Sequence, residues 1–375
     1  MKHDIGTIRN VAVEFPIYGD FISGAPYGSG HINDTYAVAF NQAGASLRYI
    51  FQRINHEIFK DPAALMENIK RVTSHQASKL VGRSDSSRRT LTVVETRSGL
   101  PYHLDEGGNY WRVYPMIEGA QSHDVLETPT QAFNAAKAFG GFQKLLVDLP
   151  GGRLQETIPH FHDTPKRLDA FKEALMRDSA NRALDAKPEI DFVLARVPMA
   201  SRLLDLHAAG KIPERVTHND TKLNNVLIDE VTNEGLCVID LDTVMPGLAL
   251  YDFGDMVRTG TSPASEDERD LSKVRARLDM FTALLEGYLS EAAAFLNDTE
   301  KELLPFSGML ITFEIGIRFL TDFLSGDVYF KTSRPGHNLD RCRTQFKLVE
   351  SLESQEEALN RALSTALEKT SAGEL

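Results

Sequence analysis

The residue pattern changes character near residue 116 of this 375-residue chain, and no other feature restricts its fold as strongly. After a weakly patterned lead-in at 1–20, the first part alternates polar and apolar residues in short runs between glycine turns, as strands do. Four runs have this pattern: 31–40, 47–54, 90–96 and 109–117. A helical pattern interrupts them at 61–78, where Asp61 can cap the first turn and Pro62 fits it. The first part is therefore predicted to be an antiparallel sheet that carries one helix.

Beyond residue 116 the pattern is mostly helical. Within 128–149, for example, apolar residues recur at the three- and four-residue spacings of a helix face; they are Phe133, Ala136, Phe139, Phe142 and Leu146. Similar patterns fill 164–178, 188–208, 268–296, 302–325 and 339–366. Only 224–229 and 235–242 have the pattern of strands, and the turn signal "EVTNEG" separates them. We predict an α+β fold with a sheet-rich lobe at 1–117, a helical lobe at 118–375 and a ligand between the lobes.

Composition excludes several classes of protein. The formal net charge of −12 argues against a general nucleic-acid-binding protein, which presents a basic surface. The chain shows neither the apolar core of a signal peptide nor an uncharged apolar run long enough to span a membrane. Its two cysteines, Cys237 and Cys342, lack the spacing of a redox or metal pair and are expected to be reduced and structural. We therefore expect a cytoplasmic protein without nucleic-acid or membrane partners. The sequence leaves the oligomeric state open and is compatible with a monomer.

The segment 217–229, "THNDTKLNNVLID", carries the strongest chemical signal. Asp220 is followed five residues later by Asn225, and Asp240 ends the next strand-like run. Protein kinases place the same residue types in this order. Phosphoryl transfer from ATP needs Mg²⁺, which prefers carboxylate and amide oxygens, and a carboxylate that accepts the proton of the attacking hydroxyl. Asp220 is therefore predicted to be the base, in contact with substrate, and Asn225 and Asp240 the Mg²⁺ ligands. The alternative is a polar turn without chemistry. His218 is expected to hold the backbone of this loop and not to transfer protons.

A phosphate-binding loop is predicted at Gly28, Ser29 and Gly30. Glycines let backbone N–H groups approach phosphate oxygens, although the same letters also make an ordinary hairpin turn. No GxxxxGK[ST] motif occurs, which excludes a P-loop nucleotide fold.

The rest of the nucleotide site is predicted from the following segments. Arg53 stands where kinases place a lysine that bridges the ATP phosphates, and Glu67 is its predicted helix partner; a surface ion pair is the alternative. The adenine is expected to meet the backbone of Met116, Ile117 and Glu118. Trp111 is expected in the core.

The strings "HNDTKLNNVLID", "VIDLDTVMPG" and "YDFGDMVR" resemble the aminoglycoside phosphotransferase and choline kinase superfamily. Within it, the chain is most similar to the bacterial N-acetylhexosamine 1-kinases, over nearly its whole length. The resemblance implies a protein-kinase-like fold of two lobes, Mg-ATP as donor and a GlcNAc or GalNAc acceptor phosphorylated at its anomeric hydroxyl. It implies the roles given above for Asp220, Asn225 and Asp240, and a supporting role for Asp252 beneath the catalytic loop.

An acceptor site is predicted from the apolar segment around 308–330. Glu314, Arg318 and Asp322 share one helix face there, and a buried arginine needs partners. Either these three form an ion network within the helix, or Arg318 binds the sugar together with Tyr329 and His31, as the resemblance favours. Charged residues at 331–341 are expected in a solvated loop; they are Lys331, Arg334, His337 and Arg341.

Two alternatives to a sugar 1-kinase stay open. The acceptor can be another small alcohol, such as choline, an aminoglycoside or a different sugar; a cationic acceptor would want carboxylates or aromatic rings around it. The second alternative is a regulatory protein that binds nucleotide without catalysis, which the replacement of lysine by Arg53 favours.

Overall fold

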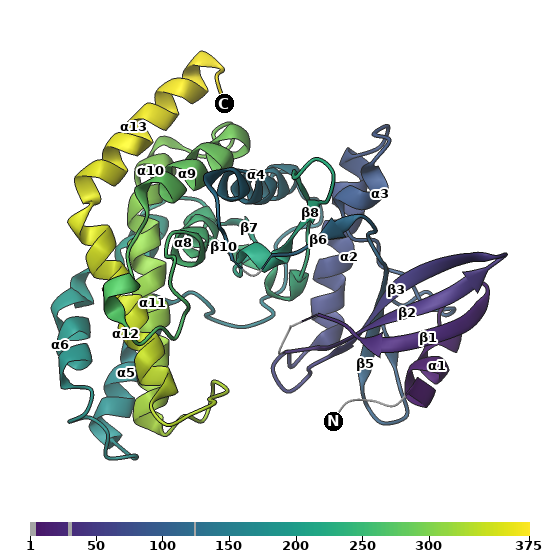
Figure 1. Cartoon of the computed structure of the whole chain (residues 1–375), viewed down its shortest axis with the longest axis horizontal. Coiled ribbons are helices and arrows are strands. Elements are labelled where there is room, and N and C mark those ends of the chain that lie inside the picture. The colour runs from purple at the N-terminus through teal and green to yellow at the C-terminus, as the bar shows by residue number, and fades with distance from the viewer. Residues whose placement is uncertain (1–4, 29–31, 124) are drawn as a thin grey trace.

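The computed structural model describes residues 5–28, 32–123 and 125–375. It consists of a sheet-rich part and a larger helical part that lie side by side (Figure 1). Ser29, Gly30 and His31, three of the predicted site residues, lie outside the described residues.

The first part is a five-stranded antiparallel sheet in the order β1-β2-β3-β5-β4. Its elements are α1 Ile5–Val13, β1 Asp20–Pro26, β2 Asp34–Gln42, β3 Ala45–Ile54, α2 Pro62–Lys79, α3 Ser86–Arg89, β4 His103–Leu104 and β5 Tyr110–Pro115. Asp61 caps α2 by accepting from the Ala64 amide at 3.0 Å, as predicted.

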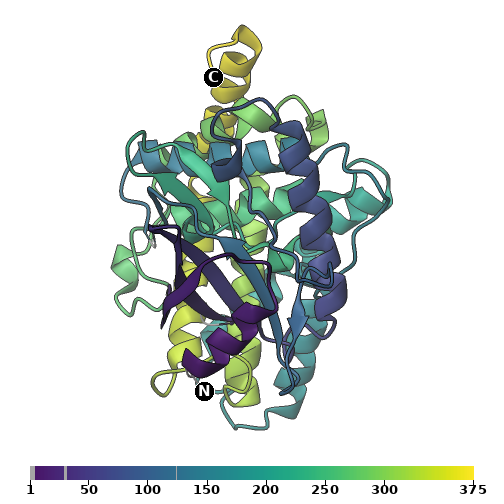
Figure 2. The same cartoon turned by 90° about the vertical axis from the view of Figure 1, so that its right-hand side faces the viewer.

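The two faces of this sheet have different neighbours. Tyr36, Phe51 and Trp111 form one buried cluster with side chains of α1, which lies across the strands in Figure 2. Ile54 and Tyr114 project from the other face into the main core, which includes side chains of α2. Successive side chains of a strand point to opposite faces of the sheet, so the position of a polar residue in β3 or β5 decides whether it faces α1 or α2. Trp111 is fully buried, which confirms the expectation for it.

Two predictions for this part are wrong. The lead-in at 1–20 contains α1, whose apolar residues Ile8 and Val11 are buried against the sheet. The predicted strand at 90–96 runs beside β5, but its one backbone hydrogen bond to β5 in the described structure joins the Val94 amide to the Val113 carbonyl, at 2.9 Å. The strand that pairs with β5 at this edge of the sheet is the short β4.

The second part is mainly helical. Its helices are α4 Pro129–Leu145, α5 Thr164–Arg177, α6 Lys187–Arg196, α7 Arg202–Ala208, α8 Ala249–Gly260, α9 Leu278–Ala292, α10 Asp298–Glu302, α11 Leu304–Ser325, α12 His337–Ser354 and α13 Glu356–Ala372. Its strands are β6 Ala120–Gln121, β7 Arg215–Thr217, β8 Val226–Asp229, β9 Gly235–Val238 and β10 Met245–Gly247, and its short 3-10 turns are η1 Val197–Met199, η2 Leu223–Asn225, η3 Leu241–Thr243 and η4 Leu271–Lys273. The predicted hairpin of 224–229 and 235–242 is present as β8 and β9, which are antiparallel.

Helix α8 was not predicted, and glycines explain why. Gly254 lies within it and weakens its helical signal, because glycine is a poor helix former. A Cβ at Gly254 would lie 2.5 Å from the Ser307 carbonyl oxygen, so this glycine lets α8 approach α11 closely. Helix α11 is, within the described chain, the one helix long and apolar enough to cross a membrane, but 78% of its most apolar window is buried inside the fold. Such burial is typical of the core helix of a globular domain. Cys237 and Cys342 are both free and buried, as expected.

Replacing Gly287 with alanine is expected to destabilise the helical part. A Cβ there would lie 2.2 Å from the backbone oxygen of Phe133, so α9 and α4 would have to separate. Overpacking of this kind costs about 1–3 kcal/mol, against about 1 kcal/mol that alanine gains over glycine inside a helix. Urea unfolding should therefore show a lower free energy of unfolding for Gly287→Ala. The matched control is Gly141→Ala in α4, where the nearest atom to the new Cβ is 3.9 Å away and a gain is expected.

Candidate active site

Asp252 holds the loop that carries Asp220. Its two carboxylate oxygens accept from the amides of His218, at 2.9 Å, and Asn219, at 2.7 Å, and Gln143 donates to one of them at 2.6 Å. Burial raises the pKa of Asp252, and these hydrogen bonds and the nearby His218 partly offset that rise. The supporting role that the resemblance implied for Asp252 is thus matched by its contacts.

The loop also has an unusual backbone. Asn219, directly before Asp220, has a φ of +65°. A left-handed conformation is uncommon outside glycine, although asparagine tolerates it, and it occurs often at functional sites. The Asn219 side chain stabilises the turn by donating to the Thr243 carbonyl at 2.9 Å. The His218 Nε2 donates to the Ile239 carbonyl at 2.9 Å, in keeping with the structural role expected for it.

Asp220 projects from this loop with a quarter of its side chain exposed. The ammonium of Lys222 lies 3.0 Å from one carboxylate oxygen, and the Asn225 amide nitrogen donates to the other at 3.1 Å. Burial is the largest single effect and would raise the pKa of Asp220, but Lys222, His218 and Arg258 together outweigh it, so the pKa is lowered. The carboxylate is therefore ionised at neutral pH and able to accept a proton. Lys222 is a site residue that the sequence analysis missed; its signal was its position two residues after Asp220.

Asp240 is the least engaged carboxylate of the group. It has a φ of +58°, its side chain is exposed, and within the described chain it makes no hydrogen bond or ion pair. Protein atoms that partly displace water around this carboxylate, and the negative charges of Asp242 and Asp220, raise the pKa of Asp240 to about 6. Negative charges that repel one another around a free carboxylate favour the binding of a cation.

The oxygen donors here fit Mg²⁺ only when a ligand adds more. No three His, Cys, Asp or Glu side chains are grouped as a metal site among the described residues. Asn225 uses its nitrogen for Asp220, so its side-chain oxygen stays open, beside the free Asp240. Mg²⁺ is typically held by one or two protein oxygens together with substrate phosphates and water. This donor set therefore suits a metal–nucleotide complex better than a resident structural ion.

The predicted pair between Arg53 and Glu67 is wrong. Arg53 pairs with Asp34, at 2.5 Å, and Glu67 is exposed on α2 with no partner in the described structure. The physical reason is strand register: Arg53 lies on the same side of β3 as Phe51, which packs against α1. The neighbouring Gln52 is the β3 residue on the α2 side.

A different arginine occupies the α2 side of the sheet. Arg112 of β5 is 1% exposed; its Nε donates to Gln52 at 2.9 Å and its guanidinium forms an ion pair with Asp242. Asn33, just after the glycine-rich loop, donates to the other oxygen of Asp242 at 2.5 Å. Sequence reasoning missed Arg112, because its partner lies 130 residues away in the chain.

The connector predicted to meet adenine is partly engaged already. The Met116 amide donates to the Arg48 carbonyl at 2.9 Å, and the Glu118 carbonyl accepts from Arg88 at 2.8 Å. The Glu118 side chain pairs with Arg48. The Met116 carbonyl, both main-chain groups of Ile117 and the Glu118 amide remain without partners in the described structure. At the glycine-rich loop, Gly28 has a φ of +79° and open space around it.

The predicted acceptor helix is α11, and its charged residues do not pair with each other. Glu314 is fully buried and accepts from Thr164 at 2.6 Å, and its other oxygen lies 2.8 Å from His162. Asp322 accepts from the amides of 328–330 and from Asn338. The ion network within the helix is therefore wrong.

Arg318 instead lies between two aromatic rings. Its guanidinium carbon is 5.4 Å from the Phe161 ring centre and 5.8 Å from that of Phe330. It has no hydrogen bond or carboxylate partner in the described part of the chain. Tyr329, next to Phe330, is 65% exposed. The adjoining His162 lies 3.2 Å from the Asn219 carbonyl, which connects this group to the catalytic loop.

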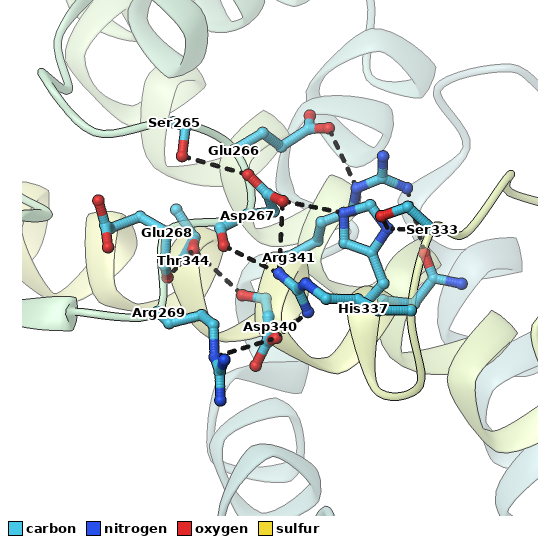
Figure 3. Close-up of polar contacts among 12 residues, drawn as sticks. Ser265, Glu266, Asp267, Glu268, Arg269, Ser333, His337, Asp340, Arg341 and Thr344 are labelled. Carbon is cyan, nitrogen blue, oxygen red and sulfur yellow. Dashed lines mark hydrogen bonds and ion pairs between the residues drawn. The ribbon is translucent and has the colours of Figure 1, made fainter.

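The expected solvated loop is present at 331–336, which is mostly exposed, but His337 begins helix α12, and Arg334, His337 and Arg341 have acidic partners. His337 is largely buried and lies 3.1 Å from the Asp267 carboxylate, beside which Figure 3 shows its ring. Arg334 pairs with Asp267 and Asp340, and Arg341 with Glu266 at 3.6 Å. The backbone carbonyl of Lys331 accepts from Arg341. Ion pairs thus join the acidic segment 265–270 to the residues at 334–341. A cavity of about 330 Å³ lies beside them, and no residue of the catalytic loop lines it.

Comparison with known proteins agrees with this geometry. The family model described as "Phosphotransferase enzyme family" matches residues 23–288. A solved microcompartment-associated aminopropanol kinase is 15% identical, with a TM-score of 0.57 over 95% of this chain and 99% of that one. A spectinomycin phosphotransferase in complex with ADP and spectinomycin is 11% identical, with a TM-score of 0.59 and coverages of 94% and 99%. A choline kinase from Cryptosporidium parvum is 14% identical, with a TM-score of 0.56 over 96% of this chain and 97% of that one. The predicted α+β, kinase-like fold is confirmed.

Proposed function

Because the chain belongs to the phosphotransferase enzyme family, we propose that it transfers the γ-phosphate of ATP to the anomeric hydroxyl of an N-acetylhexosamine, such as GlcNAc or GalNAc. The observation that carries the reaction type is the grouping of Asp220, Asn225 and Asp240 around one end of the β8–β9 hairpin. Their order and spacing are those of a catalytic carboxylate and two metal ligands.

In the proposed reaction the sheet-rich lobe, 1–117, binds the nucleotide and the helical lobe, 118–375, supplies the catalytic groups. The glycine-rich loop at 28–30 contacts the phosphates, and the backbone of 116–118 meets the adenine. Asn225 and Asp240 would hold Mg²⁺ together with the phosphates, and the bound ion would neutralise charge on the transferred group. Arg53 and Glu67 have no part in this proposal.

The chain's own residues then perform the transfer. Asp220 orients the sugar hydroxyl and accepts its proton as the bond to phosphorus forms. Lys222, which pairs with Asp220, is well situated to meet the negative charge of the phosphoryl group. Asp252 keeps the loop rigid, so the carboxylate is held in one geometry.

The charge near Arg318 supports a neutral acceptor over a cationic one. Arg167, whose pKa is lowered by burial and by the nearby Arg318, adds a second guanidinium to this region. Two such cations disfavour choline or an amino alcohol and can donate hydrogen bonds to sugar oxygens. We therefore propose that Arg318, Tyr329 and His31 contact the sugar.

ADP release over an acceptor panel tests this function. We expect turnover with GlcNAc or GalNAc and loss of the reducing end of the sugar, and none with choline, aminopropanol or an aminoglycoside. The matched control is the methyl 1-glycoside of the same sugar, which lacks the anomeric hydroxyl and should not react. Removal of Mg²⁺ with EDTA should abolish turnover. Activity with choline would refute the acceptor and retain the reaction type, and nucleotide binding without ADP release on any acceptor would indicate a regulatory protein.

A further inference from the structure

We propose that Arg112 is a positioning residue of the metal–nucleotide site: its ion pair with Asp242 holds the segment that carries Asp240 and, through Asn33, ties that segment to the glycine-rich loop. The inference rests on the proposed function in one respect, that Asp240 binds the metal of the metal–nucleotide complex. Arg112 was not among the site residues predicted from the motifs, and the phosphate-binding cation expected there was Arg53.

The pair is buried more deeply than stability alone would favour. The Arg112 side chain is 1% exposed and that of Asp242 4%. Taking two charges out of water costs several kcal/mol each, and the mutual attraction of such a pair often only offsets this. A buried ion pair is therefore weak evidence for a stability role. Its location, two residues from Asp240, points to a role in geometry.

Arg112 ends a line of polar side chains that crosses the sheet. Thr35 of β2 accepts from Gln52 of β3 at 3.0 Å, and Gln52 accepts from the Arg112 Nε at 2.9 Å. The next partner is Asp242 of η3. Three strands of the first part thus fix one carboxylate of the second part.

Asn33, which follows the glycine-rich loop in the chain, also binds the Asp242 carboxylate. Its side-chain nitrogen donates to Asp242 at 2.5 Å, while its oxygen accepts from the Asn55 amide at 2.9 Å. Both oxygens of Asp242 are then occupied by protein groups, one by Arg112 and one by Asn33. The charge of Asp242 is offset by Arg112, which leaves Asp240 as the carboxylate available to a metal.

Arg112 is not placed as a phosphate ligand in this arrangement, because its side chain is 1% exposed and its Nε and Nη1 are engaged by Gln52 and Asp242. It acts through Asp242. Groups that orient a metal site from outside its ligand set typically change metal affinity or activity by about 10–100-fold when removed. A loss of this size is the expected effect.

The test measures the affinity of Mn²⁺, as a probe for Mg²⁺, for the protein–ADP complex by the electron paramagnetic resonance signal of free Mn²⁺. Arg112→Met, which keeps the length and removes the charge, should weaken Mn²⁺ binding about 10–100-fold. Arg112→Lys keeps the positive charge but loses the planar guanidinium, so its Mn²⁺ affinity should lie between those of Arg112→Met and the unmodified protein. Turnover of Arg112→Met should recover at raised Mg²⁺, with the KM for the acceptor unchanged.

The matched control is Arg53→Met. This variant removes the ion pair between Arg53 and Asp34, which belongs to the same five-stranded sheet but lies on the face that packs against α1. It should change the melting temperature and leave the Mn²⁺ affinity as in the unmodified protein. Equal Mn²⁺ affinities for Arg112→Met and the unmodified protein, or an equal loss in Arg53→Met, would overturn the proposal.

Asn33→Ala keeps the proposal testable if Arg112→Met fails to fold, because Asn33 is near the surface. It should weaken Mn²⁺ binding about 5-fold or more, and unchanged binding would then overturn the inference. The binding assay needs no acceptor, so failure of the sugar panel leaves this result standing. Absence of any Mn²⁺ binding by the unmodified ADP complex would overturn both the metal site and the inference.

Discussion

Asp220→Asn is expected to lower turnover by about 10²–10⁴-fold, the usual contribution of a positioned acid–base group. Asparagine keeps the shape of the side chain and can still meet Lys222 and Asn225, but it cannot take the proton of the attacking hydroxyl. The lowered pKa of Asp220 means that the unmodified carboxylate is ionised at neutral pH. ADP release at saturating ATP and acceptor measures the effect, and the affinity for Mg-ADP should change little.

A carboxylate of the same hairpin provides the control. Asp229 ends β8, accepts from the amides of Val231 and Thr232 at 2.9 Å, and pairs with Arg88. It stabilises the turn between β8 and β9 and lies at the opposite end of that strand from Asn225. Asp229→Asn should keep full turnover. Normal turnover in Asp220→Asn, with the protein folded, would refute the assignment of the base.

Asp252→Ala is expected to have the largest effect on stability. The substitution removes the acceptor for the amides of His218 and Asn219 and for the side chain of Gln143, all of them buried. Each buried donor left without a partner costs about 1–3 kcal/mol, so the free energy of unfolding should fall by roughly 3–5 kcal/mol. Urea unfolding followed by circular dichroism measures the loss.

Asp252→Asn separates the charge from the hydrogen bonds. Asparagine retains one acceptor oxygen for the loop amides, so its loss of stability should be clearly smaller than that of alanine. Turnover should still fall in both variants, because the catalytic loop is less firmly held. If Asp252→Ala were as stable as the unmodified protein, the amides of the loop would have to find other partners, and the supporting role of Asp252 would be wrong.

Most of the secondary structure and the centre of the candidate site were predictable, because their signals are local. The hairpin at 224–242 has its strands and turn within twenty residues, so Asn225 and Asp240 follow from spacing. Helix α2 carries its own cap at Asp61. The errors occur where local signals are weak: α1 is short, α8 contains glycines, and 90–96 has strand-forming residues but only one hydrogen bond to β5.

Side-chain partners across the fold were not predictable. The Arg53 prediction failed because a shift of one residue along a strand moves a side chain to the other face, and only pairing with β2 and β5 determines the register. Glu314 was assigned to Arg318 by helical spacing, but it bonds to His162, which lies 152 residues away. Spacing shows which side chains can meet within one element, and the packing of distant elements decides which ones do.

By itself, then, the amino-acid order determined a sheet followed by helices and an Asp–Asn–Asp series suited to a metal–nucleotide reaction. Tertiary structure alone decided which arginine faces that series, since Arg112 and Asp242 meet only when β5 and η3 are packed together. The physical reason is range: hydrogen bonding and periodicity along one element act over a few residues, whereas burial of a charge depends on whatever the folded chain brings beside it.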